Sequence, residues 1–228
     1  MSRGPDPEDA RAFRPEALPA LVGAVADLSW LRGRGYAEDA ALKLVGDKHQ
    51  LAARQRKAVQ RAACSDEELR LRREHLRPLE GRIAVDGFNV LIGLERAISG
   101  GPLFRGRDGA LRDIAGVHGT WRRSGVTGEA VERLAETLPQ EAVVVLDRPV
   151  SNSGRLAAAL RERSEQGALG WEIEVVDHAD RRLVELELPV ATGDAWILDR
   201  RPWVDLLGAL TSAIEGAWIV ELGIGRTR

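Results

Sequence analysis

The chain has 228 residues, of which 44% are hydrophobic and 30% are charged, and its formal net charge is −2. These values are typical of a globular protein with one sizeable core, or with a core and a smaller helical unit. They exclude a membrane span, because the longest apolar run is far shorter than about 20 residues. Cys64 is the only cysteine, which excludes an intrachain disulfide, and we expect the cytoplasm as the compartment.

The N-terminal third is predicted to be helical. Residues 1–15 are rich in Pro, Asp and Arg, and we expect a flexible leader there. Over residues 16–79, apolar residues recur at steps of three and four, which predicts a helical domain. Gly46-Asp47 is expected to interrupt its second helix. Ser65 is followed three residues later by Glu68, a capping box that starts the last helix of this domain.

A local excess of positive charge lies in this helical domain. Between Leu42 and Ala63, six basic residues stand against Asp47 alone. Such a stretch is suited to contact phosphates, and a solvated helix face is an equally good interpretation. We expect the domain to position nucleic acid, a protein partner or a second copy of the chain. The residues assigned to this contact are Lys48, Arg54, Lys57 and Arg61.

Residues 80–228 are predicted to form an α/β domain. Five apolar, β-rich runs occur there, namely Ile83–Val85, Ala142–Leu146, Trp171–Val176, Pro189–Ala191 and Ala217–Leu222. Helical patterns lie between several of them, at Ala110–Arg123, Thr127–Leu138, Arg155–Gln166 and Trp203–Ile214. This alternation predicts a mostly parallel sheet with helices on both faces, a three-layer sandwich.

Three of the apolar runs end in an aspartate. Asp86 and Asp147 come directly after the first two runs, and Asp194 follows the fourth. The carboxyl ends of parallel strands meet at one edge of a sheet, so these carboxylates are expected to converge. A cluster of carboxylates suits Mg²⁺ or Mn²⁺, which can activate water for phosphodiester hydrolysis. For each acid alone, a role as a turn or helix N-cap residue is the alternative.

The sequence carries no competing cofactor motif. It has no Walker-type glycine loop, no G-x-G-x-x-G after the first strand and no G-x-S-x-G nucleophile elbow. With one cysteine and four histidines, a tetrahedral zinc cluster is not expected. A metal held by oxygen ligands is therefore the favoured chemistry.

The segments around these acids resemble a known family. Val85–Val90 resembles the first strand of PIN-like and NYN-type nuclease domains, where a V-D-G-Y/F-N run carries the first metal-binding Asp. Val144–Asp147 is similar to their central strand, and Ala191–Asp194 to their T-x-D segment, where the Thr supports the acid. The resemblance implies a Rossmann-like sheet and a Mg²⁺- or Mn²⁺-dependent ribonuclease or flap nuclease, with Asp86, Asp147 and Asp194 as catalytic metal ligands.

The resemblance also implies further acids. PIN domains usually offer an acid on a helix after the first strand, and Asp108 and Asp113 compete for that place. Asp180 and Asp199 are the candidates for completing the metal shell. Some PIN-like domains have lost the metal and only bind, so the fold alone does not establish catalysis.

Most of the chain also resembles an uncharacterised prokaryotic family that joins a helical domain of unknown function to a PIN-like domain. The segments that carry this resemblance are Gly35-Tyr36, Ala41–Asp47, Arg54–Arg56, Arg105–Gly109, Asp147–Gly154 and Asp194–Arg200.

Several polar residues near these acids are expected to bind substrate. The stretch 151–154 precedes a predicted helix, whose N-terminal N–H groups favour a phosphate, although Ser and Asn are also common N-caps. Arg105 and Arg107 lie on a glycine-rich segment expected to cover the site, where Arg112 also flanks Asp108. The full set is Asn89, Arg105, Arg107, Arg148, Ser151, Asn152, Ser153 and Thr192.

Among the tryptophans, Trp121 lies beside Arg122 and Arg123 and is the expected platform for a nucleobase. Trp196 lies in an apolar context and is expected in the core.

These observations lead to one main hypothesis, a metal-dependent nuclease that acts on RNA. Two alternatives remain open. One is a non-catalytic module that binds nucleic acid or protein on a degenerate PIN-like sheet, and the other is a small-molecule phosphohydrolase on a Rossmann-like fold.

Overall fold

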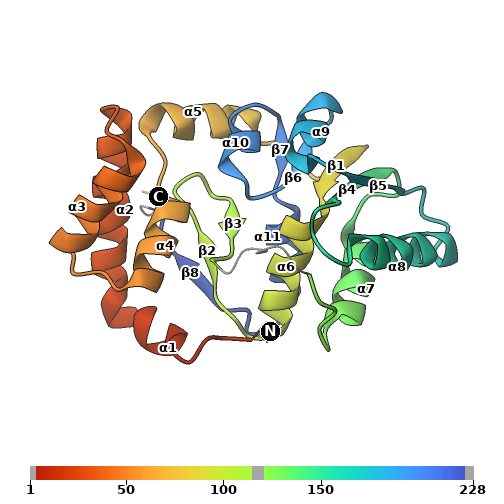
Figure 1. The fold of residues 1–228 in the computed structure, drawn as a ribbon, viewed down its shortest axis with the longest axis horizontal. Coiled ribbons are helices and arrows are strands. Elements are labelled where there is room, and N and C mark those ends of the chain that lie inside the picture. Colours follow the sequence, from red (N-terminus) through yellow and green to blue (C-terminus); the bar gives the residue numbers. More distant parts are fainter. Residues whose placement is uncertain (1–3, 115–120, 224–228) are drawn as a thin grey trace.

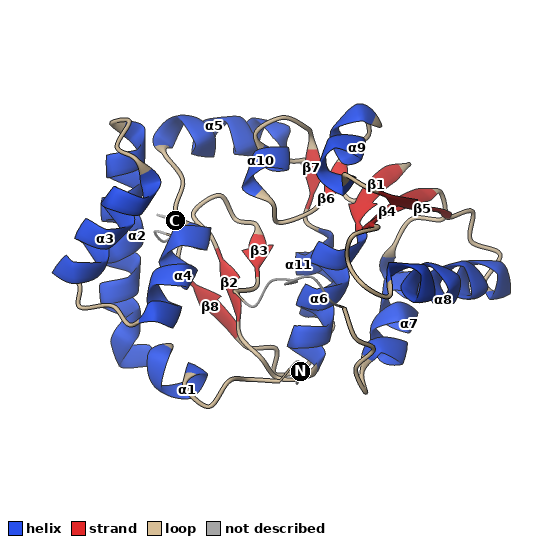
Figure 2. Ribbon diagram, in the orientation of Figure 1, coloured by secondary structure: helices blue, strands red, loops and turns tan. Residues whose placement is uncertain are grey.

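The structure is a computed structural model that describes residues 4–114 and 121–223. A helical region, a small sheet and a larger sheet follow one another across the molecule (Figures 1 and 2). The helical region consists of α1 (Asp9–Ala12), a 3₁₀ turn (Pro15–Ala17), α2 (Leu18–Gly33), α3 (Glu38–Lys48), α4 (Ala53–Ala62) and α5 (Asp66–His75). The predicted N-terminal helical region is thus confirmed.

Local sequence explains the helix boundaries of this region. The predicted capping box starts α5, since the Glu68 N–H donates to Ser65 Oγ at 3.1 Å and the Ser65 N–H donates to Glu68 Oε2 at 2.6 Å. Gly46 does not interrupt α3 as expected. It lies within the helix, where the Arg56 guanidinium occupies the space that a larger side chain would need.

The segment expected to be a flexible leader is held against the rest of the chain. Asp9 is fully buried at the start of α1. Its carboxylate accepts hydrogen bonds from Arg54 Nε on α4 and from Arg96 Nη2, both at 2.8 Å. A buried carboxylate is stable only when it is paired, so these two arginines hold the N-terminal segment in place.

The larger sheet has five parallel strands, as the strand and helix alternation predicts. In spatial order they are β5 (Glu172–Val176), β4 (Ala142–Asp147), β1 (Ile83–Asp86), β6 (Val190–Ala191) and β7 (Trp203–Val204). The central strands β4, β1 and β6 are those whose ends carry the predicted acids.

Helices cover both faces of this sheet. Side chains alternate along a strand, so Ile83 and Val85 join one apolar core while Ala84 joins another. The first core is built with α6 (Gly87–Ile98), α7 (Thr127–Thr137), α8 (Ser153–Gln166) and α11 (Leu206–Ser212). The second is built with α9 (Ala179–Glu185) and α10 (Ala195–Leu198).

The small sheet was not predicted. It consists of β3 (Leu111–Arg112), β2 (Leu103–Arg105) and β8 (Ile219–Glu221), in that spatial order. The run at 217–222 therefore does not extend the main sheet, whose edge is formed by β7 instead. The helix expected at 110–123 is also wrong where the chain is described, because β3 lies there, and residues 115–120 are outside the described residues.

The small sheet joins the two regions. The Phe104 ring on β2 meets that of Phe13 edge-on, with centroids 4.6 Å apart, and Val220 on β8 lies in the same apolar core as α2 and α4. In the parts of the chain that the structure describes, no helix is both long and apolar enough to cross a membrane.

Candidate functional site

Four acids gather at the carboxyl edge of the main sheet. Asp86 ends β1, Asp147 ends β4, Asp194 follows β6, and Asp180 lies on α9 beyond β5. The charges of Asp180 and Asp194 act on Asp86, and those of Asp194 and Asp147 act on Asp180. Among the described residues, none of the four forms an ion pair with a basic side chain. Asp86, Asp147 and Asp194 thus follow neighbouring strands at the same edge of the sheet, and Asp180 interacts electrostatically with each of them.

Asp86 has the most perturbed carboxylate of the four. Burial raises its pKa to about 7, although hydrogen bonds from Thr192 Oγ1 and from the Asn89 N–H lower it, and the charges of Asp180 and Asp194 raise it further. The hydrogen bond from Thr192 is 2.9 Å long and that from Asn89 is 3.2 Å long. At neutral pH this carboxyl group is poised between its protonated and ionised forms.

Asp180 shows the same repulsion more weakly. Partial burial raises its pKa, as do the charges of Asp194 and Asp147. The residue as a whole is exposed, so solvent screens these effects. Asp180 thus feels the negative charge of both Asp194 and Asp147.

Asn89 and Thr192 position the loop that carries Asp194. The Gly193 N–H donates to Asn89 Oδ1 at 2.8 Å, and Thr192 Oγ1 accepts from the Asp194 N–H at 3.0 Å. The Gly193 carbonyl accepts from Arg112 Nε at 2.8 Å. A Cβ on Gly193 would lie 2.8 Å from a main-chain oxygen of β3, so only glycine fits between these partners. Asn89 and Thr192, predicted to bind substrate, here hold the acids in place.

Asp147 and Asp194 each use one oxygen to cap a helix. Asp147 Oδ1 accepts from the Ala179 N–H at 2.9 Å, and Asp194 Oδ1 accepts from the Trp196 N–H at 2.8 Å. Among the described residues, the other oxygen of each carboxylate receives no hydrogen bond. The described residues hold no group of three or more His, Cys, Asp or Glu side chains already close enough to bind a metal ion. The donor set fits a hard cation, which would have to draw these free oxygens together.

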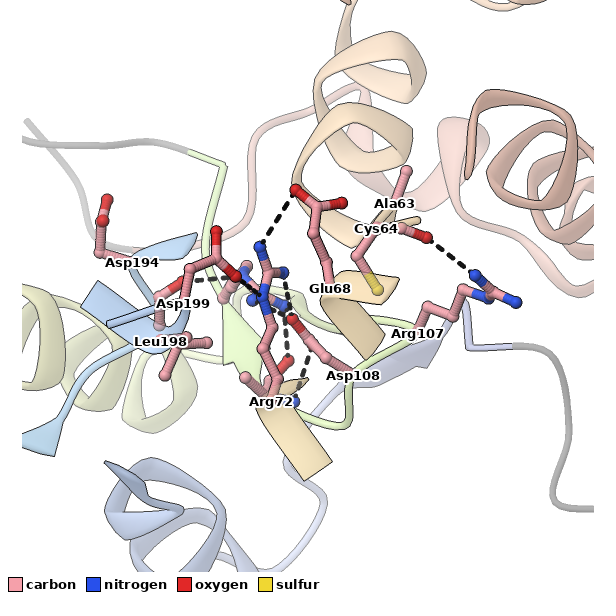
Figure 3. Close-up of polar contacts among 12 residues, drawn as sticks. Ala63, Cys64, Glu68, Arg72, Arg107, Asp108, Asp194, Leu198 and Asp199 are labelled. Carbon is pink, nitrogen blue, oxygen red and sulfur yellow. Dashed lines mark hydrogen bonds and ion pairs between the residues drawn. The ribbon is translucent and has the colours of Figure 1, made fainter. Parts of the chain in front are cut away.

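Asp108 and Asp199 do not belong to this cluster. Arg72 of α5, 1% exposed, donates from Nη1 to Asp108 at 2.7 Å and from Nε to Asp199 at 2.6 Å (Figure 3). Arg112 Nη2 donates to Asp108 at 2.6 Å. Burial raises the pKa of Asp108, but Arg112 and Arg72 lower it more, to about 2. Both acids are thus neutralised by a buried arginine cluster, and Asp194 stands apart from it in Figure 3.

Asp113 does not lie at the end of a main-sheet strand. It follows β3, and one of its carboxylate oxygens is buried without a hydrogen-bond partner among the described residues. A role for Asp113 as a metal ligand therefore stays a prediction.

The three arginines predicted to bind phosphate have acidic partners. The pairs are Arg105 with Glu221 at 3.2 Å, Arg107 with Asp66 at 2.5 Å and Arg148 with Asp177 at 3.2 Å. Arg107 also donates to the Cys64 carbonyl (Figure 3), which links the loop between β2 and β3 to the helical region. Arg148 and Asp177 are both exposed, and such a pair contributes little.

The segment 151–153 shapes the connection between β4 and α8. Asn152 Nδ2 donates to the Trp121 carbonyl at 2.9 Å, and buried Ser153 donates from Oγ to the Arg148 carbonyl at 3.4 Å. Of the three residues predicted to bind phosphate here, only Ser151 has an exposed side chain.

The basic surface of the helical region is smaller than predicted. Arg54 is bound to Asp9, as described above, and Lys48 Nζ lies 2.7 Å from Asp27. Lys57 and Arg61 remain exposed and have no ion pair among the described residues.

The roles expected of the two tryptophans are reversed. Trp121 is 3% exposed and lies in the main core, near Phe88. Trp196 is 44% exposed, two residues after Asp194, and the Arg200 guanidinium lies 4.3 Å from the centre of its ring. The exposed aromatic ring that follows Asp194 is therefore that of Trp196. The sequence signal for this exposed ring was its position in the first turn of the helix that follows a strand-end acid.

Comparison with known proteins places this chain in an uncharacterised family. Residues 20–75 match the family described as "Protein of unknown function (DUF434)", and residues 76–209 match "Domain of unknown function (DUF5616)". An uncharacterized protein of the archaeon Methanocaldococcus jannaschii is 33% identical over 196 residues, which cover 83% of this chain and 94% of that protein. No solved structure matches the chain. The chain thus belongs to the DUF5616 family, with a DUF434 region in front of that domain.

Proposed function

We propose that the chain is a metal-dependent nuclease with a PIN-like domain. The observation that carries this proposal is the gathering of Asp86, Asp147, Asp180 and Asp194 without basic counter-ions among the described residues. Carboxylates this close repel one another unless a proton or a cation lies between them. A cluster used only for structure would be expected to have arginine partners, as Asp108 has.

The donors suit Mg²⁺ or Mn²⁺. Asp86 and the free carboxylate oxygens of Asp147 and Asp194 would hold the ion, with Asp180 beside them. When bound, an ion of this kind would lower the pKa of a coordinated water and neutralise negative charge on a phosphodiester. Thr192 keeps the Asp86 carboxylate oriented through a hydrogen bond to Oδ2, and Asn89 and Arg112 fix the loop of Asp194.

The surroundings favour a nucleic acid with accessible bases, and RNA by resemblance to PIN-like and NYN-type ribonucleases. An exposed tryptophan can stack on a base that is not paired within a duplex, which contributes about 1 to 3 kcal/mol per base. Trp196 offers such a ring within one helical turn of Asp194. The neighbouring Arg200 adds a positive charge for a phosphate.

The test is hydrolysis of a labelled single-stranded RNA with Mn²⁺ or Mg²⁺. We expect cleavage that EDTA abolishes and that falls at least about 100-fold in Asp194→Asn, since one charge-stabilising group is lost. Asp177→Asn is the matched control, because Asp177 also follows a strand but is exposed and paired with Arg148. Its activity should stay within about twofold of wild type. Cleavage that persists in Asp194→Asn or in EDTA contradicts the proposal.

A second candidate is a module that binds nucleic acid or protein without cleaving it. It is favoured by the absence, among the described residues, of a preformed three-ligand metal group. RNA binding without cleavage in either metal ion would support it. Hydrolysis of a mononucleotide but not of RNA would instead support the phosphohydrolase alternative.

A further inference from the structure

Helices α7 and α8 lie on the face of the sheet opposite α9 (Figure 1). Residues of both helices line a groove. Its volume is about 520 Å³, and its lining includes the segment that begins at Trp121. Along α8 the lining extends from Asn152 to Gln166, a length of about 20 Å at 1.5 Å per residue. This shape suits a chain-like ligand better than a compact one.

The groove is rich in unpaired arginine. Arg122, Arg123 and Arg155 line it, are exposed, and have no ion pair among the described residues. Further along the groove, Arg163 is paired with Glu132 at 2.7 Å. Three free guanidinium groups on one groove contrast with the net charge of −2 of the whole chain. They favour a ligand that carries several negative charges.

Trp121 gives a second, independent indication of a ligand. Its Nε1 atom is buried and has no hydrogen-bond acceptor among the described residues, although the residue lines the groove. A buried donor without an acceptor costs about 1 to 3 kcal/mol. An acceptor oxygen held in the groove would remove this cost.

The groove starts at the same edge of the sheet as the acid cluster. In a parallel α/β unit, the helix after a strand starts at the carboxyl edge and runs back across the sheet. Asp147 ends β4, and α8 starts at Ser153, six residues later (153 − 147). The groove therefore leads from the acids along the helical face.

We propose that this groove binds the sugar-phosphate backbone of a single-stranded nucleic acid and leads the strand to the acid cluster. The proposal rests on the proposed function for the identity of the strand. A basic groove that follows the backbone is the usual means of binding single strands.

The test is the affinity of a fluorescein-labelled single-stranded RNA, measured by anisotropy with non-cleaving Asp194→Asn protein. Adding Arg122→Glu and Arg155→Glu is expected to weaken binding at least about tenfold. Each lost phosphate contact should also reduce the slope of log K against log salt by about 0.7. Adding Arg70→Glu and Arg181→Glu, two exposed arginines outside the groove on α5 and α9, is the matched control and should change affinity less than about threefold. Circular dichroism checks that all variants fold.

An affinity unchanged by the groove variants would overturn the groove proposal, and so would an equal loss of affinity in the control. Competition by a mononucleotide as effective as that by the RNA would also overturn it. Hydrolysis of bis(p-nitrophenyl) phosphate, which is too small to reach along the groove, separates the two proposals. We expect this activity to be the same in wild type and in Arg122→Glu/Arg155→Glu protein. Its absence in wild type, with RNA affinity still dependent on the groove, would remove the nuclease proposal and leave the groove standing.

Discussion

Asp86→Asn is expected to stabilise the metal-free protein at pH 8 while it abolishes metal-dependent hydrolysis. Burial raises the pKa of Asp86 to about 7 in the folded state, whereas an unfolded chain gives about 3.9. The folded state therefore holds this proton more tightly, so the stability of the wild type falls as pH rises from about 4 to 7. The full shift corresponds to about 4 kcal/mol. Because Asp86 is only partly buried as a residue, we expect about 1 to 3 kcal/mol.

The measurement is urea unfolding with EDTA at pH 4, 6 and 8. The free energy of unfolding of Asp86→Asn should differ little from that of wild type at pH 4. Its advantage should grow between pH 4 and pH 8, since asparagine does not titrate. Asp177→Asn, at an exposed site, should give a difference that is flat with pH. If Asp86→Asn differs from wild type in free energy of unfolding by the same amount at pH 8 as at pH 4, ionisation of Asp86 does not destabilise the folded state.

Arg72→Met is expected to destabilise the protein by about 3 to 5 kcal/mol, because it leaves buried carboxylates without their partner. Arg72 is 1% exposed and binds both Asp108 and Asp199. Methionine fills much of the same space, so the loss comes from charge and hydrogen bonds rather than from a cavity. The effect should appear as a lower urea midpoint with an unchanged slope.

Arg70→Met is the matched control for this cluster. Arg70 lies on the same helix, but 64% of its side chain is exposed, and it pairs only with Glu74. Its change should stay within about 0.5 kcal/mol. Adding Asp108→Asn to Arg72→Met should cost less than the sum of the two single changes, since the two side chains interact directly. Additive effects, or a cost for Arg72→Met similar to that for Arg70→Met, would show that the cluster does not join α5 to the rest of the chain.

The sequence predicted the main sheet and its acids because both rest on local patterns. Unbroken apolar runs gave β1 and β4, a β-rich run with two glutamates gave β5, and the residue type at the strand ends gave Asp86 and Asp147. Parallel strands bring such ends together without further information. This is why the sequence alone places three acids, far apart in the chain, at one edge of the sheet.

The parts that the sequence did not predict depend on long-range contacts or on very short elements. Helix α6 is buried almost all round, so it shows no polar face that would mark a surface helix. The strands β3 and β7 have two residues each, too few for a periodic pattern. Arg72 lies in a charged stretch typical of a solvated helix, and its partner Asp199 is 127 residues away.

The same reason explains the misassigned site residues. Asp108 and Asp199 have the residue type of metal ligands, and only the position of Arg72 shows that they are already neutralised. Trp121 and Trp196 are both followed by an arginine within four residues, so local sequence did not separate the buried ring from the exposed one.

Direct binding of Mn²⁺, measured by isothermal titration calorimetry at pH 7, tests the central claim that the strand-end acids hold a metal. We predict saturable binding to the wild type that is lost in Asp86→Asn and in Asp194→Asn but kept in Asp177→Asn. Because the pKa of Asp86 is about 7, binding should also release a fraction of a proton, seen as a heat that depends on the buffer. No binding to the wild type, or equal binding to Asp86→Asn, would contradict the account.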